Sequence, residues 1–100
     1  MKEFYEFENK VVKIIVKTLE HYSIELKKHG ITYDYPEVEI WNNSSDKYES
    51  EYRIPIYKDN ELVDILESHI IRNGKAIASL DEFKAWIQED INDIIRDSKM

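Results

Sequence analysis

One group of side chains has the types that acid–base chemistry needs: Ser50, Tyr52, Glu67 and His69. Glu67 and His69 are two residues apart, so they share one face of a strand, and the strand pairing argued below places Tyr52 and Ser50 opposite them. Imidazole and carboxylate groups exchange protons near neutral pH, which makes these residues a candidate ligand or catalytic site. The alternative is that they hydrogen-bond one another at the end of the core.

A second pair, His21 and Glu25, lies one helical turn apart, but the HExxH motif and a third ligand are absent. The chain has no Cys, which excludes disulfides, thiol catalysis and zinc sites built on Cys. No motif for a nucleotide or for calcium is present either. We therefore expect no catalytic residue, no metal and no cofactor.

Composition narrows the class of protein. The 100 residues, of which 42% are hydrophobic, are enough for a single domain with one core. A net charge of -7 and a pI near 4.9 argue against nucleic acid and anionic membranes as partners, and favour a basic protein. The acidic N-terminus lacks the pattern of a signal peptide and no apolar run is long enough to span a bilayer, so we expect a cytoplasmic protein.

The elements follow from the spacing of apolar residues. Residues 3 to 29 repeat them every three or four positions, which predicts one long amphipathic helix that ends at Gly30. Residues 31 to 41 alternate like a strand, and Pro36 makes that strand an edge strand because proline cannot donate to a ladder.

The centre of the predicted fold is a β-hairpin over residues 47 to 72 with Asp59-Asn60 at its tip. Pairing Tyr57 with Leu62 would place Ile54 opposite Ile65 on the core face. Asn73-Gly74 predicts a second tight turn, followed by a short strand over residues 75 to 78. Ser79 and Glu82 form a capping box that begins the last helix.

The expected fold class is therefore α+β: a two-layer sandwich of order α-β-β-β-(β)-α, with both helices on one face of an antiparallel sheet. In the alternative, the C-terminal helix covers the other face. The order is similar to that of the double-stranded-RNA-binding domain, but the start of the second helix reads SLDEFK and is acidic. The similarity is one of topology only.

The sheet face turned away from the helices is the predicted interface. If Trp41 pairs with Lys47, Glu39 faces Glu49 and Glu37 faces Glu51, so four carboxylates share one surface that a basic partner would neutralise. The same face receives apolar side chains that no third helix covers. Its predicted residues are Glu37, Glu39, Trp41, Glu49, Glu51, Tyr57, Leu62, Leu66 and Ile70.

These patterns favour a small acidic, non-catalytic protein-binding module, comparable in size and charge to inhibitors, immunity proteins and antitoxins. Two alternatives stay open. One is a ligand-binding protein or enzyme that uses the polar cluster around His69 and Glu67. The other is a homodimer formed through the outer sheet face without a basic partner.

Overall fold

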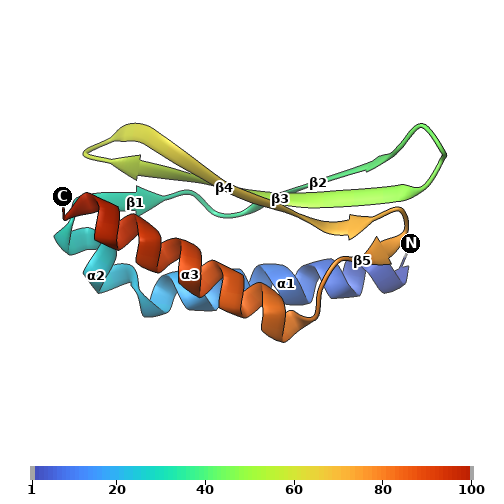
Figure 1. Cartoon of the computed structure of the whole chain (residues 1–100), viewed down its shortest axis with the longest axis horizontal. Coiled ribbons are helices and arrows are strands. Elements are labelled where there is room, and N and C mark those ends of the chain that lie inside the picture. The colour runs from blue at the N-terminus through green and yellow to red at the C-terminus, as the bar shows by residue number, and fades with distance from the viewer. Residues whose placement is uncertain (1, 100) are drawn as a thin grey trace.

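The computed structural model describes residues 2–99, with side chains from residue 4 onward. A five-stranded antiparallel sheet lies on a layer of helices (Figure 1). The elements in chain order are α1 (Lys2–His21), α2 (Ser23–Lys28), β1 (Ile31–Tyr33), β2 (Glu37–Asn42), β3 (Tyr48–Lys58), β4 (Glu61–Arg72), β5 (Lys75–Ala76) and α3 (Leu80–Ser98).

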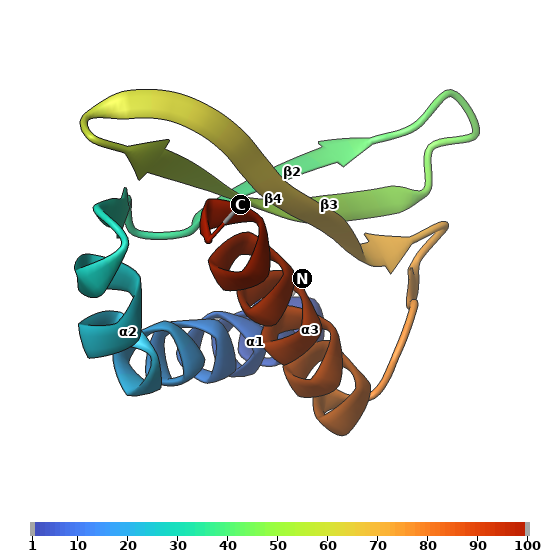
Figure 2. The same cartoon turned by 60° about the vertical axis from the view of Figure 1, so that its left-hand side comes forward.

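Both long helices lie on the same face of the sheet, as predicted (Figures 1 and 2). The sheet order is β1-β3-β4-β5, and β2 also pairs with β3. The two-layer α+β sandwich is thus confirmed, and the alternative in which the C-terminal helix crosses to the other face is wrong. No helix of the described chain covers the opposite face of the sheet, which we call the outer face.

The core lies between the layers. α1 contributes Val11, Ile15 and Leu19 from one stripe, and every second residue of β3 points down to meet them. α1 and α3 also contact each other and close the core on the side away from the sheet. The α3 residues buried in this core are Phe83, Ile87, Ile91 and Ile95.

The predicted single helix over residues 3 to 29 is broken at Tyr22, where α1 ends and α2 begins. The Tyr22 N–H donates to the carbonyls of both Thr18 and Leu19 at 3.2 Å, a shared bond of the kind found at helix ends. α2 turns toward the sheet in Figure 2, which lets Leu26 enter the core.

The predicted edge strand over residues 31 to 41 is also split, into β1 and β2, with Pro36 in the break. Both pieces pair with β3, so the assignment to an edge is confirmed. The break explains why β3 tolerates Pro55 in its centre. The Pro55 carbonyl accepts from the Asp34 N–H on this side, so the missing N–H of Pro55 points at the gap rather than at β4.

The β3–β4 hairpin has the predicted tip: Asp59 and Asn60 both have positive φ, and Tyr57 pairs with Leu62. Beyond that pair the predicted register is wrong. A bulge at Val63 shifts β4 by one residue, so Ile54 pairs with Leu66 instead of Ile65. Because successive side chains alternate between faces, the shift turns the following β4 residues over.

A second bulge follows at Ile70, between the pairs Glu51–His69 and Ser50–Ile71. Together the two bulges direct Leu66, Ile70 and Ile71 toward the helices, where all three are buried. Three of the six apolar residues of β4 are thereby buried against the helices, while Leu62, Val63 and Ile65 stay exposed.

The C-terminal part of the chain has the turn, the strand and the helix start that the sequence predicts. Asn73 and Gly74 both have positive φ and connect β4 to β5, which is shorter than predicted. Ser79 accepts from the Glu82 N–H while the Glu82 carboxylate accepts from the Ser79 N–H, so the predicted capping box is present and α3 begins at Leu80.

Candidate protein-binding face

The outer face carries the carboxylates that the sequence placed there, in a register shifted by two residues. Trp41 pairs with Glu49 rather than with Lys47, so Glu39 lies opposite Glu51. A shift of two preserves the face on which each side chain points. Glu37, Glu39 and Glu51 therefore share the outer face of β2 and β3, and Glu67 joins them from β4.

Arg53 lies at the centre of this group. Its Nε is 3.1 Å from Glu67 Oε2 and its Nη1 is 3.9 Å from Glu39 Oε1, while Glu37 is its partner across the strands. Two like charges about 4 Å apart repel by about 1 kcal/mol in water, so one guanidinium among these carboxylates offsets part of that cost. We call Glu37, Glu39, Glu51, Arg53 and Glu67 the acidic patch. It keeps an excess of negative charge.

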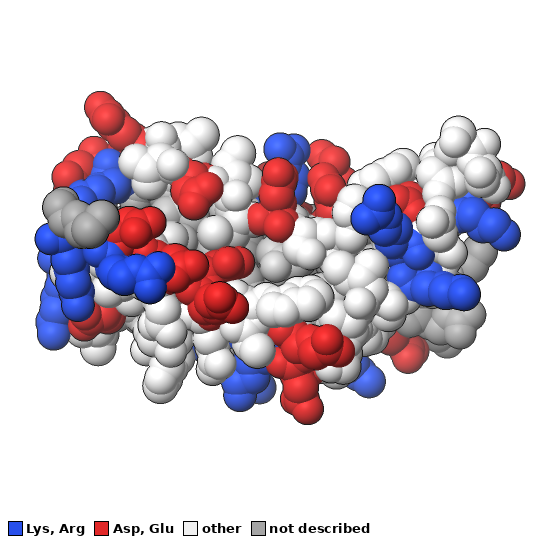
Figure 3. Space-filling view, viewed as in Figure 1, with Lys and Arg blue, Asp and Glu red and all other residues white. Residues whose placement is uncertain are grey.

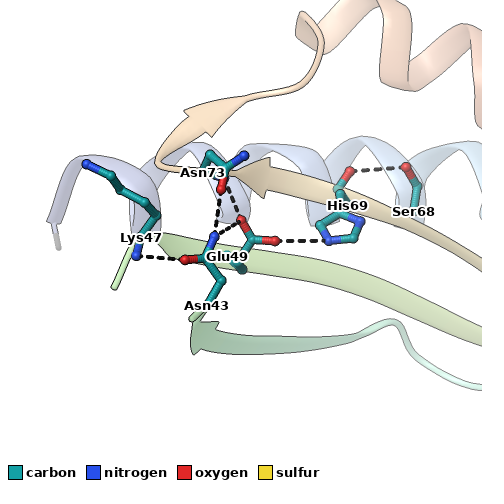
Figure 4. Close-up of polar contacts among 6 residues, drawn as sticks. All are labelled: Asn43, Lys47, Glu49, Ser68, His69 and Asn73. Carbon is teal, nitrogen blue, oxygen red and sulfur yellow. Dashed lines mark hydrogen bonds and ion pairs between the residues drawn. The ribbon is translucent and has the colours of Figure 1, made fainter. Parts of the chain in front are cut away.

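Glu49 shares this face but is buried, with its side chain only 8% exposed. Figure 4 shows its carboxylate pointing toward Asn43, Asn73 and His69. Its carboxylate accepts from the Asn73 N–H and, at 3.3 Å, from Asn43 Nδ2, and its other oxygen lies 3.4 Å from His69 Nε2. Asn43 Nδ2 also donates to Asn73 Oδ1 at 2.6 Å. This Glu49 cluster joins the β2–β3 loop, the β4–β5 turn and β4 at one end of the sheet.

Trp41 is held by the same cluster. Its ring meets the His69 ring edge to face at 5.8 Å between centroids, and His69 is in turn oriented by Glu49. Trp41 stays 37% exposed. A large aromatic side chain with a fixed orientation beside charged groups is typical of the residues that anchor protein interfaces.

At the other end of the outer face, the predicted apolar ridge is only partly present. Tyr57 and Leu62 are there, and the Tyr57 hydroxyl donates to Asp34 Oδ2 at 2.7 Å. Leu66 and Ile70 are not, because the bulges turn them into the core, where their exposures are 8% and 0%. Ile65, expected in the core, lies on the outer face and is 37% exposed.

The predicted polar site is divided by the same register change. Ser50 and Tyr52 face the helices, whereas Glu67 and His69 lie on the outer face, so the four residues form no common site. Glu67 pairs with Arg53 and His69 with Glu49 instead. Ser50 is buried and its Oγ has no hydrogen-bond partner among the described residues.

Burial raises the pKa values of two tyrosines in the sandwich. Desolvation raises the pKa of Tyr48 to about 12, assisted by its hydrogen bonds of 3.1 and 3.0 Å to the Glu8 carboxylate. Desolvation also raises the pKa of Tyr52 to about 12, with a contribution from Asp90 on α3. Both hydroxyl groups therefore stay protonated at neutral pH.

Asp90 belongs to a second concentration of acids, between α3 and β4. Partial burial raises the pKa of the Asp90 carboxyl, and repulsion from Asp93, Glu89 and Asp64 adds to the effect. Asp64 is the β4 residue opposite Ile56, so it points to the helix side of the sheet. Figure 3 shows acidic side chains along this side of the molecule.

A cavity of about 200 Å³ opens at the end of this seam, and none of the predicted site residues lines it. Its walls are mostly apolar, and Lys58 crosses its rim to donate to the Ser98 carbonyl at 3.3 Å. The lining residues are Ile31, Ile56, Lys58, Val63, Asp64, Ile94, Asp97 and Ser98. Within residues 2–99, the His, Asp and Glu side chains form no group that could hold a metal ion.

No helix in the described part of the chain is long and apolar enough to span a membrane. Comparison with known proteins found no match: no family model, no curated protein and no solved structure resembles the chain. The geometry of the outer face and of β4 is therefore the basis for any functional proposal.

Proposed function

We propose that this chain is a small non-catalytic protein-binding domain that binds a basic protein through the outer face of its sheet. In size and charge it resembles inhibitors, immunity proteins and antitoxins, which block a basic partner. The observation that carries the proposal is the acidic patch: four carboxylates around one arginine on a sheet face that no helix covers. A basic surface would neutralise the charge that Arg53 leaves unbalanced.

Trp41 supports the proposal as an anchor. It lies beside the acidic patch, half-exposed, and the Glu49 cluster limits its motion. Binding then costs little side-chain entropy at the residue that contributes most contact area. The carboxylates would steer the partner and Trp41 would supply the contact that slows dissociation.

The alternatives have less support from the geometry. An enzyme or ligand site built on Ser50, Tyr52, Glu67 and His69 needs those residues on one face, and they occupy two. A homodimer through the outer face would place Glu39 and Glu51 against the same carboxylates of a second copy. We retain both only as outcomes of the test.

The test is a capture experiment with matched variants. The double variant Glu39→Gln and Glu51→Gln removes two charges from the acidic patch, and Glu6→Gln with Glu20→Gln removes two exposed charges from α1. We expect the wild-type protein and the α1 variant to retain one basic protein from the native host at low salt. The patch variant should lose it, and so should all three at high salt.

Equal retention by both variants would refute the proposal, since the position of the charges would then not matter. So would a partner that stays bound in high salt. A mass measurement of the free protein runs in parallel: a dimer that the patch substitutions strengthen would establish self-association through this face instead.

A further inference from the structure

The sheet has one long edge without a strand neighbour. β4 runs from Glu61 to Arg72, but β5 pairs only with Ile71 and Arg72, and the Ile77 N–H reaches the Ile70 carbonyl just before them. Among residues 2–99, no strand therefore pairs with residues 61 to 69 on that side, over about 30 Å. The opposite edge of the sheet consists of two short strands broken at Pro36, which cannot offer a continuous ladder.

The backbone groups on the open edge can be assigned from the position of Pro55. The Pro55 carbonyl points to the side of Asp34, so the pair Pro55–Ile65 is of the non-hydrogen-bonded type and Ile65 directs its N–H and C=O outward. The register is continuous from there to His69. Glu67 and His69 therefore also present their N–H and C=O groups to the open edge.

Two of these groups are already engaged by side chains. The Ile65 N–H donates to Asp64 Oδ1 at 2.8 Å, and the His69 carbonyl accepts from Ser68 Oγ at 3.1 Å. Both contacts agree with the outward assignment. They are local and replaceable, and the groups of Glu67 between them have no hydrogen bond within the described residues.

The side chains along the edge are partly apolar. Leu62, Val63 and Ile65 are 56%, 58% and 37% exposed. An unpaired strand that combines free backbone groups with exposed apolar side chains has the features to which extended segments add as a further strand.

The acidic residues around the open edge indicate which kind of segment could bind there. β4 and α3, which border the open edge, contain nine acidic and three basic side chains, so they account for six of the seven net negative charges of the chain. Asp64 is an inward-pointing charge on the edge strand, and its repulsion helps to raise the pKa of Asp90. A second copy of β4 would bring its own Asp64 and Glu67 to this edge, which opposes self-pairing.

We propose that the open edge of β4 binds an extended basic segment of the partner by strand addition. Its backbone would pair with Ile65 and Glu67, and alternate Lys or Arg side chains would face Asp64 and Asp90. This inference rests on the proposed function, because it assumes a basic partner, but it concerns the backbone edge of β4, which shares only Glu67 with the acidic patch.

The test uses a peptide of about eight residues that alternates lysine with threonine or valine, and a matched peptide with glutamate at every lysine position. Amide hydrogen exchange of the full chain is followed by NMR. The lysine peptide should slow exchange at Ile65 and Glu67 by about tenfold or more, with no change at amides that already face β3. The glutamate peptide should leave both amides unchanged.

Ile65→Pro removes an outward N–H without removing a bond to β3, so the domain should fold and lose peptide binding. Ile65→Thr keeps that N–H and is the matched control, which should retain binding. Asp64→Lys, at an exposed position, leaves eight acidic and four basic side chains on β4 and α3, so it should weaken binding of the lysine peptide without making the glutamate peptide bind.

Three outcomes would overturn the inference. Binding with shifts only around Glu39 and Glu51 would leave the proposed function standing without strand addition. No binding of the lysine peptide would remove the edge as a site, while the capture experiment still decides the function. Protection at Ile65 that grows with the concentration of the protein alone would identify a second copy as the occupant.

Discussion

Glu49 should be the most costly carboxylate to remove from the outer face. It is buried, and its carboxylate accepts hydrogen bonds from the Asn73 N–H and from Asn43 Nδ2 and lies within ion-pair distance of His69 Nε2. In Glu49→Ala the Asn73 N–H loses its acceptor at a partly buried turn, which costs about 1–3 kcal/mol. Asn43 keeps its hydrogen bond to Asn73 Oδ1 in this variant, so losing its bond to Glu49 adds less to the cost.

The expected loss for Glu49→Ala is about 2 kcal/mol of the free energy of unfolding. For a domain of this size that lowers the melting temperature by about 10 °C. Glu49→Gln keeps an oxygen for Asn73 and should lose only part of this. Urea unfolding and thermal melts measure both, and the Trp41 indole N–H resonance reports whether the ring loses its fixed environment.

Glu51→Ala is the matched control, since Glu51 is two residues along the same strand, faces the same side and lies opposite Glu39. It makes no ion pair among the described side chains. Its removal relieves repulsion, so stability should change by less than about 0.5 kcal/mol. If Glu49→Ala and Glu51→Ala lose equal stability, the Glu49 cluster does not hold the end of the sheet and the reasoning is wrong.

Three further predictions test the core and its charges. Leu66→Ala should cost about 2–5 kcal/mol in urea unfolding and Leu62→Ala less than about 0.5, because the bulge buries only Leu66; equal losses would contradict the observed register. Asp90→Asn should stabilise the fold at pH 7 by less than about 1 kcal/mol, since the group is partly exposed, and the gain should vanish near pH 3. Because the pKa of Asp90 is raised in the folded state, its ionisation destabilises the fold only at pH values above the pKa that this carboxyl has in the unfolded chain. A gain in stability that persists at pH 3 would show that ionisation of Asp90 is not its cause. Tyr48 and Tyr52 each have a pKa raised to about 12, so the stability that their protonated forms contribute is complete below pH 10 and is lost toward pH 12. An absorbance titration should therefore show these two tyrosines ionising after the exposed ones, together with unfolding.

Local signals in the sequence predicted most of the fold. The two tight turns follow from Asp59-Asn60 and Asn73-Gly74, and the start of α3 follows from the Ser79 capping box, because each depends on a few adjacent residues. Periodicity identified both helices and the layer they share. The break at Tyr22 has no local signal, since no Gly or Pro marks it and its effect is tertiary: α2 turns toward the sheet and Leu26 enters the core.

The bulges could not be predicted in the same way. Val63 and Ile70 are ordinary strand residues, and nothing in their types marks them as extra. The bulges are stabilised by tertiary packing, because only the shifted register buries Leu66, Ile70 and Ile71 together. The Glu49 cluster was missed for a related reason, because Asn43 and Asn73 are distant in sequence and meet only once both turns have formed.

The bulges also change which kind of partner the outer face suits. Contact between two copies would have needed Leu62, Leu66 and Ile70 as apolar area, and two of these are now in the core. What remains outside is a charged centre with Trp41 at one end and Tyr57, Leu62 and Ile65 at the other. Burial of Leu66 and Ile70 therefore removes apolar area that a sheet-to-sheet dimer would use, which is consistent with the proposed binding of a basic protein.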